Sequence, residues 1–371
     1  MNLSVGIIGL PNVGKSTLFN ALLKKQQAFV ANYPFATIEP NVGIVPVPDE
    51  RLNKLAEITK EEEKMSEFPP IKPATVNFVD IAGLVKGASE GAGLGNKFLS
   101  HIREVSIIAH VVRAFEDENI IKEGSVDPKS DYVTVNTELI LADIESLQKS
   151  KIVNAKKTSI LSSIDGKKRE LIEKIINSLN KGIPVRDMHL SNEEQGSLRE
   201  FFLLSGKPEI IVLNVSENDY SEKKFGEIYS RYTNISSVNK MVIVCAKIEA
   251  DLSELAEEEQ KEYLSDLGVK ESGLERLIQK AYQTLGLISF LTAGEKEVRA
   301  WTIEKGTKAV DAAGVIHTDF TKKFIKAEVV SYEDFISLGG WKEAREKGKA
   351  RLEGRDYIMQ DGDVVEFKIG S

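Results

Sequence analysis

The chain has 371 residues, enough for two or three domains, and 42% of them are hydrophobic, so ordinary packed cores are expected. Its formal net charge of −8 argues against a general polyanion binder and leaves nucleic-acid contacts to local basic patches. A single cysteine excludes a disulfide within the chain and fits a reducing compartment. No apolar run approaches the roughly 18 residues of a membrane span, so we expect a soluble, cytoplasmic protein that does not enter a membrane.

The first motif is a glycine-rich loop at residues 9–17, which reads GLPNVGKST and fits G-x-x-x-x-G-K-[ST]. The pattern predicts a buried strand before the loop and a helix after it. Glycines let the backbone fold around a phosphate, which then faces backbone N–H groups and the helix N-terminus. Lys15 supplies a positive charge to the β- and γ-phosphates, and the Ser16 hydroxyl can ligate Mg²⁺. The loop therefore predicts a nucleotide-binding site.

Two later segments carry the residues that a nucleotide switch requires. Thr37 lies in a segment whose prolines forbid a long helix, and its hydroxyl suits a loop that orders around the γ-phosphate and Mg²⁺. Asp80 ends a predicted strand at 75–80 and opens a D-x-x-G motif that Gly83 completes. A carboxylate at this place holds Mg²⁺, and the N–H of Gly83 can donate to the γ-phosphate. D-x-x-G is a weak pattern alone, and it gains value from its order after the phosphate loop.

The residue after this motif is Leu84, where switch GTPases usually carry a glutamine that orients the attacking water. We therefore expect another group, a bound cation or a partner to place the water, and we expect slow unassisted hydrolysis. The glycine-rich residues 85–95 predict a loop that can order and disorder.

Residues 127–206 predict an inserted helical arm. Leucine and isoleucine recur at helical spacing from 139 to 179, with lysine and glutamate between them, which favours long antiparallel helices, partly coiled. Between 149 and 174 there are eight basic and three acidic residues, an excess of positive charge in an acidic chain. A solvated helix face and a contact to RNA phosphates both explain this excess.

The guanine-recognition motifs of GTPases are altered. These enzymes carry N-K-x-D and S-A-K at two strand ends, and the aspartate accepts hydrogen bonds from guanine N1–H and the 2-amino group. Here the first strand end reads NVSE at 214–217, with Val215 and Glu217 in place of the lysine and aspartate, and the second reads CAK at 245–247. Adenine offers neither of those donors. Guanine selectivity therefore lacks its usual basis.

The composition shifts again near residue 289 and predicts a small β-grasp module. Its expected strands lie at 298–303, 324–330 and 363–369, and its expected helices at 307–314 and 343–347. This part carries a second basic segment, 342–355, with six basic and three acidic residues.

These motifs together resemble the YchF-type Obg-like ATPases, a branch of the translation-factor-related P-loop NTPases. The resemblance covers essentially the whole chain and rests on GLPNVGKST at 9–17, YPFATIEPN at 33–41, DIAGLVKGAS at 80–89, NVSE at 214–217, EVRAWTI at 297–303, HTDF at 317–320 and DYIMQDGDV at 356–364.

The resemblance implies an α/β fold, in which a P-loop nucleotide domain is interrupted by a helical, coiled-coil arm and followed by a β-grasp TGS domain. We place the nucleotide domain at 1–126 and 207–286, the arm at 127–206 and the TGS domain at 287–371. It also implies an ATPase that prefers adenine despite its GTPase-like core and that associates with ribosomes.

The motifs and the resemblance together give the expected site residues. Nucleotide contacts are expected from Asn12, Val13, Gly14, Lys15, Ser16, Thr17, Asn214, Val215 and Glu217, Mg²⁺ contacts from Ser16, Thr37 and Asp80, and catalytic contacts from Lys15 and Gly83.

Three further positions bear on catalysis. Leu84 agrees with the family's hydrophobic replacement of glutamine, whereas Lys122 stands where members often carry a histidine. Water activation by a histidine at that place is therefore not expected, and a lone histidine nearby, such as His110, more often has a structural role. Asn12 lies where related proteins use an asparagine to help bind K⁺, so K⁺ is a second expected cation.

We therefore expect a monomeric, slow, Mg²⁺-dependent ATPase switch that binds the ribosome or a ribosomal subunit, with the arm and the TGS domain on rRNA phosphates. Two alternatives stay open. A GTPase of the same fold would be distinguished by comparing ATP and GTP affinities. A non-hydrolysing RNA-binding adaptor would show no turnover even with ribosomes and K⁺.

Overall fold

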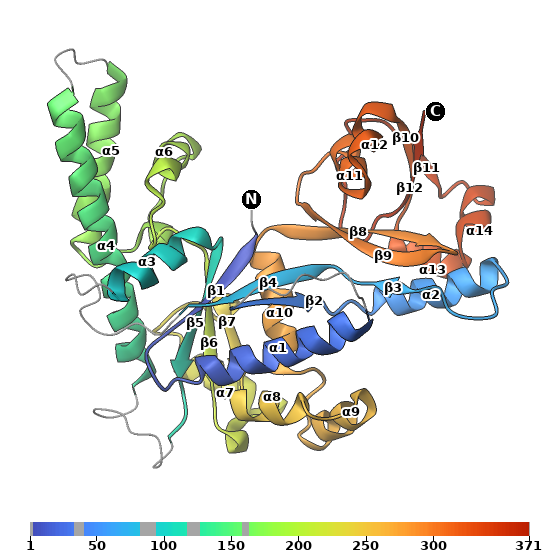
Figure 1. Ribbon diagram of the computed structural model, residues 1–371, viewed down its shortest axis with the longest axis horizontal. Helices are drawn as coiled ribbons and strands as arrows, with labels where there is room; N and C mark the ends of the chain where they lie inside the picture. The colour runs from blue at the N-terminus through green and yellow to red at the C-terminus, as the bar shows by residue number, and fades with distance from the viewer. Residues whose placement is uncertain (1–2, 33–40, 82–93, 117–126, 158–162, 371) are drawn as a thin grey trace. The chain divides into compact units, whose positions relative to one another are not determined.

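The computed structural model describes residues 3–32, 41–81, 94–116, 127–157 and 163–370. The chain divides into two compact units (Figure 1). The first unit comprises Met1–Ile44 and Asn77–Leu277, and the second comprises Val45–Val76 and Ile278–Ser371.

A six-stranded sheet forms the centre of the first unit, with the strand order β2-β4-β1-β5-β6-β7. β1 pairs in parallel with β4 and β5, and β5, β6 and β7 continue the parallel pairing. All residues of β1, β5, β6 and β7 are buried, which explains why these strands are continuous apolar runs. The strands are β1 Ser4–Ile8, β2 Val42–Pro46, β4 Thr75–Asp80, β5 Ile107–Arg113, β6 Glu209–Asn214 and β7 Met241–Val244.

Helices pack against this sheet, and their buried side chains form the hydrophobic core of the unit together with those of the strands. One cluster of buried side chains joins α3 and α4 to β1 and β5, and a second joins α7, α8 and α9 to β6 and β7. The nucleotide loop and its helix therefore emerge from a sheet that is fixed by packing. In the first unit, the α-helices outside the arm are α1 Lys15–Asn32, α3 Leu94–Glu104, α7 Glu222–Arg231, α8 Ala246–Leu252 and α9 Glu257–Asp266, and α10 Gly273–Thr284 begins in this unit.

The arm is built on α4 Pro128–Lys157, whose second half lies beside α5 Ser163–Leu179 (Figure 1). The predicted apolar spacing is realised, because Leu147 of α4 and Leu171, Ile175 and Leu179 of α5 share one buried cluster. The chain returns to β6 through α6 Asn192–Leu198 and the 3₁₀ turns η2 Val185–Asp187 and η3 Arg199–Phe201. The predicted inserted helical arm is confirmed.

The second unit has its own mixed sheet, with the strand order β11-β10-β12-β8-β9-β3. Its core joins α11 to β9, β10 and β12. The strands are β3 Ile71–Lys72, β8 Leu287–Gly294, β9 Glu297–Glu304, β10 Phe324–Val330, β11 Arg351–Glu353 and β12 Val364–Ile369, and the helices are α2 Arg51–Glu62, α11 Ala309–Ile316, α12 Thr318–Lys323, α13 Tyr332–Leu338 and α14 Trp341–Glu346.

Residues 45–76 belong to this second unit, a grouping that the sequence did not suggest. β3 pairs in parallel with β9 through Ile71 and Val298. The carboxylate of Glu62 accepts hydrogen bonds from the backbone N–H groups of Trp341 and Lys342 at the start of α14. The domain boundaries expected from the sequence stay predictions, and these contacts favour counting 45–76 with the C-terminal residues.

Among the helices of the described ranges, none is both long and apolar enough to cross a membrane.

Candidate nucleotide-binding site

The glycine-rich loop follows β1 and is held closely against its neighbours. Gly9 has a φ of 149°, and a Cβ there would lie 2.4 Å from the carbonyl oxygen of Val111 on β5. Gly14 has a φ of 97°, and a Cβ there would lie 2.2 Å from Nδ2 of Asn214. Both positions require glycine, because a side chain would be strained and would push the loop away from the sheet.

Lys15 begins α1 and turns back across this loop. Its Nζ donates a hydrogen bond to the backbone oxygen of Leu10 at 2.7 Å, and the residue is only 8% exposed. Burial lowers the pKa of Lys15 to about 8, although Asp80 acts in the opposite direction. The loop therefore surrounds a positive charge that lacks a full hydration shell, and a phosphate would stabilise that charge.

Asp80 supplies the negative partner. It is the last residue of β4 and lies opposite Ile7 of β1, the strand that leads into the loop. Burial raises the pKa of Asp80, and Lys15 partly offsets this effect. The half-buried carboxylate at this strand end and the hydroxyl of Ser16, an exposed residue at the start of α1, are oxygen donors of the kind that Mg²⁺ prefers.

The remaining predicted loop residues have different environments. Asn12 and Thr17 are exposed, and Asn12 has a φ of 62°, whereas Val13 is buried. Thr37, Gly83, Leu84 and Lys122 lie outside the described residues. The structure thus brings Lys15, Ser16 and Asp80 to one edge of the sheet.

The three residues expected near the base differ from one another. The Asn214 carboxamide donates from Nδ2 to the Val13 oxygen and accepts from the Ala246 N–H, both at 2.9 Å. Val215 is 3% exposed and packs in the core. Glu217 is exposed and forms an ion pair with Lys247 at 2.6 Å. The role of Asn214 as a bridge to the phosphate loop was missed, because nothing in the sequence links residues 13, 214 and 246.

Known proteins resemble this chain over its whole length. A family model described as a 50S ribosome-binding GTPase matches residues 4–138, and a YchF GTPase C-terminal model, described as a protein of unknown function, matches 287–370. Two similar relatives are called ribosome-binding ATPase YchF. The one from Bacillus subtilis is 47% identical and the one from Haemophilus influenzae 48% identical, and each match covers 99% of both chains.

A solved structure extends the similarity to three dimensions. The YchF GTPase of Schizosaccharomyces pombe is 41% identical, with a TM-score of 0.86, and the match covers 99% of this chain and 98% of that one. The predicted α/β fold of a P-loop nucleotide domain with an inserted arm is confirmed. Sequence and fold agree over essentially the full length, and the chain therefore belongs to the YchF family of P-loop NTPases.

Proposed function

We propose that this chain is a Mg²⁺-dependent ATPase that acts as a nucleotide switch and associates with the ribosome. The observation that carries the nucleotide part is the buried Lys15 ammonium, placed under a glycine loop and electrostatically coupled to Asp80. A buried ammonium costs stability unless a partner compensates for its lost hydration, and a bound phosphate would supply that partner.

The residues around the loop divide the work of phosphoryl transfer. Lys15 exchanges the Leu10 oxygen for the β- and γ-phosphates, and the backbone N–H groups of 12–17 face the same anion. Ser16 and Asp80, with Thr37 from the sequence motif, would hold Mg²⁺, which would neutralise charge on the phosphates. The D-x-x-G motif suggests that the N–H of Gly83 would donate to the γ-phosphate, as in other nucleotide switches.

Adenine is the proposed base. Both polar atoms of the Asn214 side chain are engaged by the backbone, and Val215 offers no donor. The carboxylate of Glu217 is paired with Lys247. The bidentate acceptor that selects guanine is therefore replaced by a neutralised ion pair, which removes the penalty against adenine.

K⁺ is proposed as a second cation. Asn12 is exposed on the phosphate loop and has a positive φ. A monovalent cation there would add positive charge during phosphoryl transfer, a role that the leucine at residue 84 leaves open.

Basic residues of the arm support an rRNA partner. Lys149, Lys168 and Lys174 are already paired with Glu145, Glu200 and Glu194. Lys167 and Arg169 are exposed on α5, and within the described ranges neither forms an ion pair. These two residues are therefore proposed as phosphate contacts of the arm, and the relatives named ribosome-binding support a ribosomal partner.

The proposed TGS domain offers fewer free charges than its sequence suggests. Arg345 pairs with Glu328 and Glu366, Lys349 with Asp334, and Arg351 with Glu353. Arg355 donates to backbone oxygens instead of facing an acid. Lys342 and Lys347 remain exposed without an ion pair in the described part of the chain, and they are the proposed contacts of this domain.

A GTPase of the same fold is the second candidate, because the solved yeast relative is called a GTPase while the bacterial relatives are called ATPases. A ribosomal partner would also favour a cytoplasmic location, and a monomer stays our proposal for the oligomeric state.

Phosphate release tests the proposal. We expect the parent protein to hydrolyse ATP slowly with Mg²⁺ and K⁺ and faster with ribosomes, and Lys15→Ala to lose detectable turnover. Lys261→Ala, on the exposed surface of α9, is the matched control. Near-normal turnover by Lys15→Ala would reject the phosphate-loop assignment, and no turnover by the parent with ribosomes and K⁺ would favour the adaptor.

A further inference from the structure

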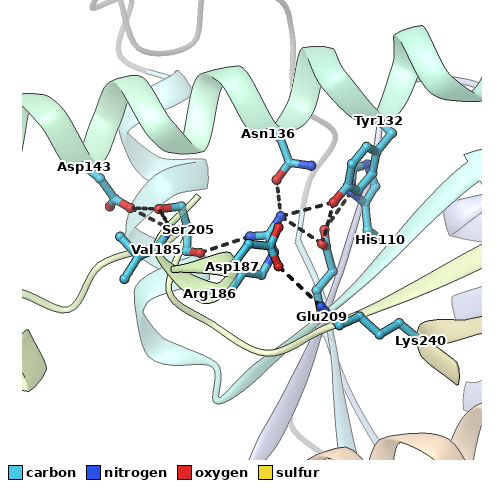
Figure 2. A network of polar contacts seen from close by, with 10 residues as sticks. All are labelled: His110, Tyr132, Asn136, Asp143, Val185, Arg186, Asp187, Ser205, Glu209 and Lys240. Atoms are coloured by element: carbon cyan, nitrogen blue, oxygen red, sulfur yellow. Dashed lines mark hydrogen bonds and ion pairs between the residues drawn. The ribbon is translucent and has the colours of Figure 1, made fainter. Parts of the chain in front are cut away.

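A buried polar network joins the base of the arm to the nucleotide sheet (Figure 2). Its centre is Glu209, the first residue of β6. One carboxylate oxygen of Glu209 pairs with Nη2 of Arg186 at 2.8 Å and accepts from the Tyr132 hydroxyl at 3.1 Å. The other oxygen lies 3.0 Å from Nδ1 of His110 on β5. Arg186 belongs to the turn η2, and Tyr132 belongs to α4.

The ion pair in this network is almost completely desolvated. The side chains of Arg186 and Glu209 are 6% and 3% exposed. Burial acts to raise the pKa of Glu209, but Arg186 and the hydrogen bonds from His110 and Tyr132 outweigh it, so the pKa lies below the usual range. The carboxylate is therefore ionised at neutral pH. Such a pair is directional, because a small rotation of either partner leaves a buried charge without its hydrogen bonds.

The network lies where the arm's longest helix rests on the sheet. Val135 and Leu139 of α4 pack with Ile108 of β5, whereas Leu147 of the same helix already packs with α5. Asn136, one turn after Tyr132, accepts a hydrogen bond from Nη2 of Arg186. Since α4 continues unbroken to Lys157, it acts as a lever, and roughly 15 Å of helix extends beyond Leu147 at about 1.5 Å per residue.

Apolar contacts alone would fix this lever poorly. Leucine, isoleucine and valine side chains tolerate small rotations of a helix, because their attraction is not directional. The guanidinium of Arg186 contacts β6 through Glu209, α4 through Asn136, and the returning chain through the backbone oxygen of Ser205 at 3.2 Å. The Arg186 side chain thus connects the outgoing helix α4 and the returning chain of the arm to strand β6 of the sheet.

That strand also reaches the nucleotide site. β6 is buried along its whole length from Glu209 to Asn214, and Asn214 donates to the Val13 oxygen in the phosphate loop. Glu209, which holds the arm, and Asn214, which holds the phosphate loop, are therefore the two ends of one buried strand.

We propose that Arg186 and Glu209 are a positioning pair, which fixes the angle of the arm on the nucleotide sheet and so pre-organises the arm for its partner. The positional part stands on the geometry alone, and the partner part rests on the proposed ribosome binding. A looser arm would hold its binding angle for a smaller fraction of the time, and the apparent affinity would fall by that fraction.

The test separates position from stability. Glu209→Gln alone leaves the Arg186 charge buried and unpaired, so it is expected to lower the unfolding midpoint. Combining Glu209→Gln with Arg186→Met removes the stranded charge and restores most of that midpoint, but not the ion pair. Glu249→Gln is the matched control, since Glu249 is also a buried carboxylate, is 2% exposed, and joins α8 to α10 through the Gly273 N–H at 2.7 Å, away from the arm.

Pulsed electron paramagnetic resonance measures the arm angle directly. Nitroxides are placed at Glu170→Cys on α5 and Lys261→Cys on α9, after Cys245→Ser removes the native thiol. We expect a narrow distance distribution in the parent and in Glu249→Gln, and a clearly broader one in the double variant. Equal widths in the parent and the folded double variant would overturn the positioning role.

Ribosome cosedimentation supplies the partner readout. We expect the double variant to bind about ten-fold more weakly, with ATP affinity within about two-fold of the parent. Unchanged ribosome binding by a broadened arm would overturn the pre-organisation claim. If the parent itself fails to bind ribosomes, the proposed function has failed, while the distance measurement still decides the positioning claim.

Discussion

Nδ2 of Asn214 donates a hydrogen bond to the backbone oxygen of Val13 at 2.9 Å, across 201 positions of sequence. Oδ1 of the same carboxamide accepts from the Ala246 N–H at 2.9 Å. One buried side chain therefore ties the phosphate loop to the ends of β6 and β7. The strand ends thus hold the loop in shape, in addition to any contact that they make with the base.

Asn214→Ala should weaken both the fold and nucleotide binding. The change leaves the Val13 oxygen and the Ala246 N–H buried without partners, and each such group costs about 1–3 kcal/mol. We expect the free energy of unfolding to fall by about 2 kcal/mol or more in urea titrations, together with weaker ATP binding. Asn218→Ala, at an exposed position of the same strand end, is the control. Equal midpoints for the two variants would contradict the bridging role.

The buried charge of Lys15 should cost stability when no nucleotide is bound. Its pKa is about 8 in the folded protein and 10.5 when unperturbed, so the unfolded chain binds more protons between these values. Lys15→Met should therefore raise the free energy of unfolding at pH 7, by up to about 3 kcal/mol. The difference in the free energy of unfolding between Lys15→Met and the parent should become smaller as pH rises from 8 toward 10, because Lys15 then loses its charge in the folded parent.

Urea titrations of the nucleotide-free proteins at pH 7 and pH 9.5 test whether the stabilisation by Lys15→Met decreases as the pH rises. Lys261→Met, with its exposed ammonium, controls for the loss of a surface charge. A stability difference between the parent and Lys15→Met that stays constant from pH 7 to pH 9.5 would argue against a buried, shifted lysine.

Much of the fold followed from periodicity and motif order. Ile7, Val111 and Leu213 lie in apolar runs whose length and turn residues predict buried parallel strands, and those strands are present. The helical spacing of Leu171 and Ile175 likewise predicted α5. Apolar runs and helical spacing are local signals, because a short stretch of the sequence contains all the residues that form them.

The grouping of residues 45–76 with the C-terminal unit did not follow from the sequence. It depends on the pairing of Ile71 with Val298 and on Glu62 capping the backbone at Trp341, contacts that join residues far apart in the chain. The same reason explains the charges of the basic segment 342–355. Counting charges along the chain gave an excess of basic residues in this segment, whereas Glu328 and Glu366 pair with Arg345 from other strands.

For the site, motif order predicted that Asp80 lies beside the phosphate loop, and Asp80 does lie opposite Ile7, because the carboxyl ends of adjacent parallel strands meet; the roles of Lys15 and Asp80 stay predictions. It expected Asn214 at the base and could not foresee that backbone groups occupy both ends of its carboxamide.

K⁺ should accelerate ATP hydrolysis relative to Na⁺. The expectation rests on Asn12, exposed on the phosphate loop, and on the added positive charge near the transferred phosphate. Phosphate release is measured in matched KCl and NaCl with Mg²⁺ fixed, and Asn12→Ala should remove the difference. Equal rates of the parent in both salts would eliminate the monovalent cation from the mechanism.

Charge reversal on α5 should weaken ribosome binding. Lys167→Glu with Arg169→Glu reverses two exposed charges of α5, neither of which forms an ion pair within the described ranges. We expect weaker cosedimentation and a slope of log affinity against log salt that is shallower by about two, roughly one for each phosphate that the variant no longer neutralises. Lys261→Glu, on α9, is the control for net charge. Undiminished binding by the double variant would clear α5 of a role in the contact.

Side-by-side calorimetric titration of ATP and GTP analogues, with Mg²⁺ present, tests the central claim most directly. We expect the parent to bind the adenine nucleotide more tightly, because Glu217 is engaged by Lys247 and no lysine stands at residue 215. Glu217→Asp should narrow the difference by restoring the shorter carboxylate, whereas Val215→Lys is unsuitable because Val215 is buried. Tighter ATP binding by the parent is the predicted result, and GTP binding at least as tight as ATP would contradict the assignment of this chain as an ATPase.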